Sequence, residues 1–148
     1  MAGLAFVVGA SGIVGNNLAR HLRARGWQVY GLARRPPNDI DGMLPVQANL
    51  LEAASLRTAL QGLRPTHAFI SAWLRQETEA DNIRINGAMV RNVLDALSPA
   101  GSLSHVALVT GLKHYLGPFE AYGKGKLPAT PLRSRTGAKA RHMASVPR

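Results

Sequence analysis

The chain has 148 residues, of which 46% are hydrophobic, enough for one domain with a buried core. It has no cysteine, which excludes disulfides and thiolate metal sites and fits a reducing cytoplasm. The formal net charge of +10 would suit a nucleic-acid partner, but residues 131–148 hold five of the 18 Lys and Arg and no acid, so half of the excess lies there. Because of this uneven distribution, nucleic acid is not an expected partner. No segment has the roughly 20 apolar residues of a membrane span, so a membrane is not an expected partner either.

The first feature along the chain is a short apolar run that leads into a glycine-rich loop. Residues 4–8, LAFVV, predict a buried parallel strand, and an amphipathic helix is predicted from Ile13 to about Arg25. Glycines alone are also typical of tight turns. A strand, a glycine turn and a helix together favour binding of a dinucleotide pyrophosphate at the free N–H groups of the helix start. The candidate cofactor-binding residues of this loop, GASGIVG, are Gly9, Ser11, Gly12, Ile13 and Gly15.

The next strand bears on which dinucleotide is bound. Residues 27–32, WQVYGL, predict this strand, and Arg34 and Arg35 follow it closely. An NAD site carries Asp or Glu here to bind the ribose 2′-hydroxyl, whereas this chain has no acid until Asp39. Guanidinium groups pair with a 2′-phosphate, which a carboxylate would repel. A solvated strand end is the alternative interpretation of the two arginines, but the pattern favours NADP(H) over NAD.

Strands and helices continue to alternate along the chain. Further strands are predicted at residues 43–48, 67–71 and 104–110, and helices at 52–60 and 78–97. The second of these helices has apolar side chains at helical spacing, which predicts one broad apolar face (Ile83, Ile85, Met89, Val90, Val93, Leu94 and Leu97). Five strands joined by helices predict an α/β fold, a doubly wound parallel Rossmann sheet in the order 3-2-1-4-5.

Ligands of such sheets bind at the carboxyl ends of the strands. Ser71 ends the fourth strand and Trp73 follows it on the expected nicotinamide side, although Trp73 is also suited to capping the core. Thr110 ends the fifth strand, and Lys113 lies three residues beyond it. An ammonium group there is within reach of a ribose or a reacting oxygen, and a solvated loop lysine is the alternative. The scattered histidines have no metal-ligand spacing, so no metal site is expected.

Several segments together resemble one family. They are residues 9–15 (GASGIVG), 29–35 (VYGLARR), 79–82 (EADN), 85–87 (ING), 91–96 (RNVLDA) and 110–120 (TGLKHYLGPFE). Over residues 3–132 the chain resembles the progesterone 5β-reductase/iridoid synthase-like group of extended short-chain dehydrogenases. The resemblance implies an NADPH-dependent reductase that delivers hydride to the β-carbon of a small-molecule enone, with Lys113 in its catalytic pair. Asn49 stands where the relatives carry an adenine-contacting aspartate.

The chain departs from this group after residue 130. The group's second catalytic residue, a tyrosine in an Asn-Phe-Tyr-Tyr segment, does not occur here. Residues 131–148 have few large apolar side chains, which predicts a disordered basic tail, of out-of-frame origin or a natural one. Residues 1–130 are then an incomplete NADP-binding domain. Tyr122 and Lys126 match the Tyr-x-x-x-Lys pair of ordinary short-chain dehydrogenases, but the glycines between them disfavour the helix that such a pair needs.

We therefore expect the cytoplasmic NADP(H)-binding portion of an enone reductase that is catalytically incomplete by itself. A non-catalytic NADP-binding sensor is the main alternative. A basic nucleic-acid binder that uses the tail is a weaker one. The fifth strand would leave one edge of the sheet unpaired, and self-association through that edge is a further expectation.

Overall fold

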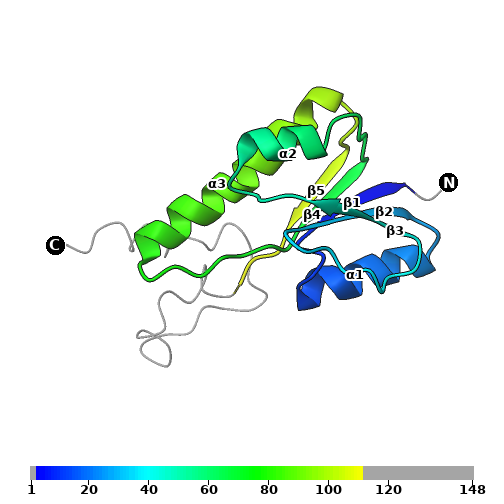
Figure 1. The fold of residues 1–148 in the computed structure, drawn as a ribbon, viewed down its shortest axis with the longest axis horizontal. Coiled ribbons are helices and arrows are strands. Elements are labelled where there is room, and N and C mark those ends of the chain that lie inside the picture. Colours follow the sequence, from blue (N-terminus) through cyan, green and yellow to red (C-terminus); the bar gives the residue numbers. More distant parts are fainter. Residues whose placement is uncertain (1–2, 112–148) are drawn as a thin grey trace, which may run out of the picture. The chain divides into compact units, whose positions relative to one another are not determined.

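The computed structural model describes residues 3–111, and the domain they form is a parallel sheet with helices on both faces (Figure 1). Its strands have the order β3-β2-β1-β4-β5, and every neighbouring pair is parallel. The predicted fold class and strand order are confirmed. The elements are β1 (Leu4–Val8), α1 (Ile13–Ala24), β2 (Gln28–Ala33), β3 (Met43–Gln47), α2 (Ala53–Ala59), β4 (His67–Ile70), α3 (Glu79–Leu97), the 3₁₀ turn η1 (Ser98–Ala100) and β5 (His105–Leu108).

Strand β1 is buried on both faces, which is why its sequence is continuously apolar rather than alternating. Phe6 and Val8 pack in a cluster with side chains of α2 and α3. Ala5 and Val7 point the other way and pack in a second cluster with α1. Figure 1 shows the same division, with α1 on one side of the sheet and α2 and α3 on the other. The core therefore consists of two layers separated by the sheet.

Helix α3 buries only part of its predicted apolar face. Met89, Val93 and Leu97, spaced four residues apart, are buried against the sheet. Ile83 is 68% exposed, because the N-terminal part of α3 extends past the strands (Figure 1). The apolar face predicted from the sequence is therefore not buried at this residue.

Strand β5 is an edge strand among the residues that the structure describes. It pairs with β4, and all four of its residues are exposed. Within residues 3–111 no helix combines the length and apolarity that crossing a membrane requires. Lys113, Tyr122, Lys126 and the segment 131–148 lie outside the described residues.

Thr78 caps the start of α3, and its removal tests how much the helix depends on that cap. Its Oγ1 accepts a hydrogen bond from the Asp81 N–H at 3.1 Å. We expect Thr78→Ala to lower the free energy of unfolding by about 1 kcal/mol, the usual loss for such a cap. Urea denaturation measures the change. Thr58→Ala is the control, because the Thr58 hydroxyl contacts only the Ala54 carbonyl of its own helix. Equal stability of Thr78→Ala and wild type would contradict this role.

The same cap carries a pH dependence. The hydroxyl of Thr78 donates to the Asp81 carboxylate at 2.7 Å, and this bond, followed by the one from Arg84, holds the pKa of Asp81 below its ordinary value. A carboxyl whose pKa is lower in the folded state stabilises the fold above its unfolded pKa, and this stabilisation is lost as pH falls through the folded pKa. We expect the stability difference between wild type and Thr78→Ala to shrink over that acid range.

Candidate cofactor-binding site

The glycine turn after β1 is fixed to the end of β2 by backbone hydrogen bonds. The N–H groups of Gly9 and Ala10 both donate to the Leu32 carbonyl, at 2.9 and 3.0 Å. Gly9 has φ +89°, a backbone conformation that favours glycine, and a Cβ here would lie 2.9 Å from the Ala72 nitrogen. The Gly12 N–H donates to the Gly9 carbonyl at 2.9 Å. The turn therefore has one defined shape, which larger residues at Gly9 would disrupt.

Gly15 allows α1 to approach this turn without an intervening side chain. A Cβ on Gly15 would overlap the Gly9 carbonyl oxygen and would lie 2.7 Å from its carbon and 2.9 Å from Ser71 Oγ. The Ser71 hydroxyl in turn donates to the Val8 carbonyl at 2.9 Å. Strand β1, helix α1 and the segment after β4 thus meet at a single point.

The start of α1 presents unpaired backbone donors. Gly12 caps the helix without any side-chain hydrogen bond, and the first bond of the helix runs from the Asn16 N–H to the Gly12 carbonyl at 2.8 Å. The N–H groups of Ile13, Val14 and Gly15 therefore have no acceptor within the helix. The first turn also has no acidic residue. This helix start fits an anion such as a pyrophosphate.

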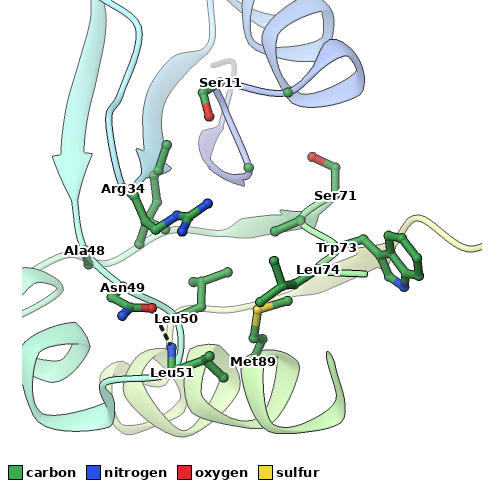
Figure 2. A pocket seen from close by; sticks show the side chains of 15 residues that line it. Ser11, Arg34, Ala48, Asn49, Leu50, Leu51, Ser71, Trp73, Leu74 and Met89 are labelled. Carbon is green, nitrogen blue, oxygen red and sulfur yellow. Dashed lines mark hydrogen bonds between the residues drawn. The ribbon is translucent and has the colours of Figure 1, made fainter. Parts of the chain in front are cut away.

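A cavity of about 320 Å³ opens beside this turn (Figure 2). Its walls come from the glycine turn, the ends of β2, β3 and β4, and Met89 of α3. Figure 2 shows the Arg34 guanidinium directed into the space below Ser11, and the Trp73 indole turned away from the centre. The combination of backbone donors, one cationic side chain and apolar walls suits an anionic ligand that has an apolar ring.

Seven of the predicted cofactor-binding residues line this cavity. They are Gly9, Ser11, Gly12, Arg34, Asn49, Ser71 and Trp73. Trp73 is 64% exposed, so it does not cap the core.

The other four predicted residues do not line the cavity. The Ile13 side chain is 86% exposed, and Gly15 is buried below the turn. Arg35 is exposed beside Arg34, and Thr110, in a separate unit that begins after Val109, is exposed too.

Sequence reasoning missed the apolar part of the lining. Leu50 and Leu74 follow β3 and β4, and Met89 projects from α3. The positions of the two leucines just after strand ends are a usable signal. The position of Met89 gives no such signal, because its spacing on α3 is that of a core residue. Met89 belongs to the core and also lines the cavity.

Arg34 and Arg35 are the cationic side chains at the end of β2. Both are exposed, and neither forms an ion pair with any residue in the range 3–111. Within residues 3–111 both guanidinium groups are without an ion pair and so are available for a phosphate, and Arg34 is the one that lines the cavity.

Asn49 is already engaged by its own loop. Its Oδ1 accepts from the Leu51 N–H at 3.1 Å, and its Nδ2 donates to Glu52 Oε1 at 2.8 Å. An amide has two N–H donors and two acceptor lone pairs. Asn49 therefore keeps one of each for a base, and Glu52 fixes its orientation.

The segment that carries Trp73 is held to α3 by asparagines. Asn86 forms hydrogen bonds with both backbone polar groups of Leu74. Its Oδ1 accepts from the Leu74 N–H at 2.8 Å, and its Nδ2 donates to the Leu74 carbonyl at 2.9 Å. Asn82 accepts from the Gln76 N–H at 2.7 Å. This wall of the cavity is thus fixed by hydrogen bonds as well as by packing. Within residues 3–111 no group of three or more acidic or histidine side chains is arranged to hold a metal.

The fold, the glycine turn and the cavity at the carboxyl ends of the strands define an NAD(P)-binding Rossmann domain of the short-chain dehydrogenase type. Residues 5–140 match the NAD dependent epimerase/dehydratase family, and the chain belongs to that family.

Comparison with known enzymes bears out the resemblance predicted from the sequence. The chain is 44% identical over 133 residues to an (S)-8-oxocitronellyl enol synthase of Camptotheca acuminata, a match that covers 83% of this chain and 34% of the relative. It is 43% identical over 126 residues to a 3-oxo-Delta(4,5)-steroid 5-beta-reductase of Arabidopsis thaliana, with 78% and 32% covered. The chain thus spans about a third of the length of these relatives.

Solved structures agree on the fold. A short-chain dehydrogenase/reductase superfamily protein from Agrobacterium tumefaciens with bound NAD matches at TM-score 0.62 and 25% identity, covering 76% of this chain and 34% of that one. The Bordetella bronchiseptica enzyme WbmG in complex with NAD matches at TM-score 0.66 and 20% identity, covering 80% and 41%. At 20% identity, the similarity to WbmG shows a shared fold and nothing more.

The close approach of α1 to the glycine turn can be tested with two glycines, each inside a helix. Gly15→Ala would place a methyl group against the Gly9 backbone, and we expect a loss of about 1–3 kcal/mol in unfolding free energy. Gly87→Ala is the matched control, because a Cβ there meets nothing within 4 Å, and it should gain about 0.5–1 kcal/mol. Thermal and urea unfolding measure both. If both variants were stabilised, the close contact at Gly15 would be refuted.

Proposed function

We propose that this chain binds NADP(H) and forms the cofactor-binding portion of an NADPH-dependent enone reductase. The observation that carries the cofactor choice is Arg34, a cationic side chain without an ion pair within residues 3–111, at the end of β2 and in the wall of the cavity. An NAD site has an acid at this point. Arg34 is suited to pair with a ribose 2′-phosphate, with Arg35 beside it as a second cation.

The remaining residues follow from this placement. The free N–H groups at the start of α1 would hold the pyrophosphate, and Ser11 and Gly12 would line its path. Asn49 would contact the adenine, and Ser71 and Trp73 would border the nicotinamide end. When bound, the nicotinamide supplies the hydride, and the residues of this chain bind and orient it.

The substrate class rests on the relatives. One of them is a 3-oxo-Delta(4,5)-steroid 5-beta-reductase, and this name describes reduction of a steroid whose double bond is conjugated to a ketone. We extend this to the chain as reduction of a small-molecule α,β-unsaturated carbonyl compound. Lys113, outside the described residues, would act near the reacting oxygen. The residues that cover the substrate would belong to the part of the relatives' length that this chain does not span.

The test is the affinity for the two reduced cofactors. NADPH should bind more tightly than NADH, and Arg34→Ala combined with Arg35→Ala should abolish the difference. Loss of charge-assisted bonds worth about 1.5–3 kcal/mol corresponds to roughly 10- to 150-fold in NADPH affinity. Quenching of Trp73 and Trp27 fluorescence or calorimetry measures both constants. Arg57→Ala, an exposed arginine of α2 away from the cavity lining, is the control and should change neither. Equal affinities of wild type for NADPH and NADH would refute the proposal.

A further inference from the structure

The loop that carries Arg34 and Arg35 is attached to α1. This loop, residues 34–42, connects β2 to β3 and is called the β2–β3 loop below. Arg20 of α1 forms an ion pair with Asp39 of the loop, and its Nε donates to Asn16 Oδ1 at 3.0 Å. Asn16 lies one helical turn before Arg20 on the same helix. The Arg20 guanidinium is therefore oriented by a side chain of α1 as well as by Asp39 of the loop.

A second set of contacts holds the next residues of the loop. The Ile40 side chain is buried in the same cluster as Leu22 of α1. Arg23 donates to the Asp41 carbonyl at 3.1 Å and to the Trp27 carbonyl at 2.7 Å. The far half of the β2–β3 loop is therefore fixed, and the Arg20–Asp39 pair is the attachment nearest in sequence to Arg34 and Arg35.

We propose that the Arg20–Asp39 pair strengthens the preference of this domain for NADPH, with Arg20 as a positioning residue for the 2′-phosphate site. The inference rests on the proposed NADP(H) binding. The pair keeps the Asp39 carboxylate on α1, four residues from Arg35. The pair also limits the paths that the near half of the loop can take, which keeps Arg34 at the cavity.

A purely electrostatic effect of the two charges would change NADPH affinity differently from positioning of the loop arginines, so the two explanations can be separated. If only the total field mattered, removing the positive Arg20 would weaken NADPH binding, whereas removing the negative Asp39 would strengthen it. If the pair positions the loop arginines, both removals weaken NADPH binding. Asp39→Ala is therefore the decisive variant.

The experiment compares NADPH and NADH affinities of the whole chain in Arg20→Ala, Asp39→Ala, the double variant and the exchanged pair Arg20→Asp with Asp39→Arg. We expect each single change to weaken NADPH binding by about two- to fivefold, the range for an exposed ion pair, and to leave NADH binding unchanged. The double variant should lose no more than the worse single one, and the exchanged pair should recover affinity. Arg84→Ala breaks a similarly exposed pair with Asp81 on α3 and is the control, with no expected effect on either cofactor.

Stronger or unaltered NADPH binding in Asp39→Ala would overturn the inference, as would an equal loss for both cofactors. Those outcomes would leave a wild-type preference for NADPH intact. If wild type itself showed no preference, the proposed NADP(H) binding would fail instead, and the two failures are thus distinguishable.

Discussion

The contact between Gly15 of α1 and the Gly9 peptide is the constraint on which the site depends. Because no side chain separates them, α1 begins directly beside the glycine turn at the carboxyl end of β1, and Ser11 and Gly12 of this turn line the cavity. The Ser71 hydroxyl bonds to Val8 at the same point and brings in the segment after β4. One glycine contact therefore brings together β1, α1 and the segment after β4 beside the cavity, whose walls include the glycine turn and that segment. A larger residue at Gly15 would separate all three at once.

Around this contact the charges are arranged for an anion. The first turn of α1 has no acid, and Arg34 at the cavity has no ion pair among the described residues. Asp39 is the first acidic residue after Arg34 and Arg35, and it forms an ion pair with Arg20 of α1. The cavity itself combines these groups with leucine and methionine side chains, which suit an apolar ring better than a second charge. This distribution supports the proposed binding of NADP(H).

The sequence predicted the parts of the molecule that local chemistry determines. A continuous apolar run such as β1 and the glycine turn after it have few alternative structures, so the strand order and seven of the 15 residues that line the cavity could be predicted. Contacts that depend on the path of a loop could not. Asp39 lies 19 residues from Arg20, and nothing in either segment indicates the other. The exposure of Ile83 likewise depends on how far α3 extends past the sheet, which periodicity does not reveal.

The most direct test of the site is to titrate the isotopically labelled chain with fragments of the cofactor and follow its backbone amide resonances. Adenosine 2′,5′-bisphosphate carries the 2′-phosphate, and adenosine 5′-monophosphate lacks it. The account predicts that the bisphosphate binds more tightly and shifts the amides of Ser11, Arg34 and Asn49, with the Arg34 shift absent for the monophosphate. Equal affinity for the two nucleotides, or shifts confined to residues away from the cavity, would contradict it.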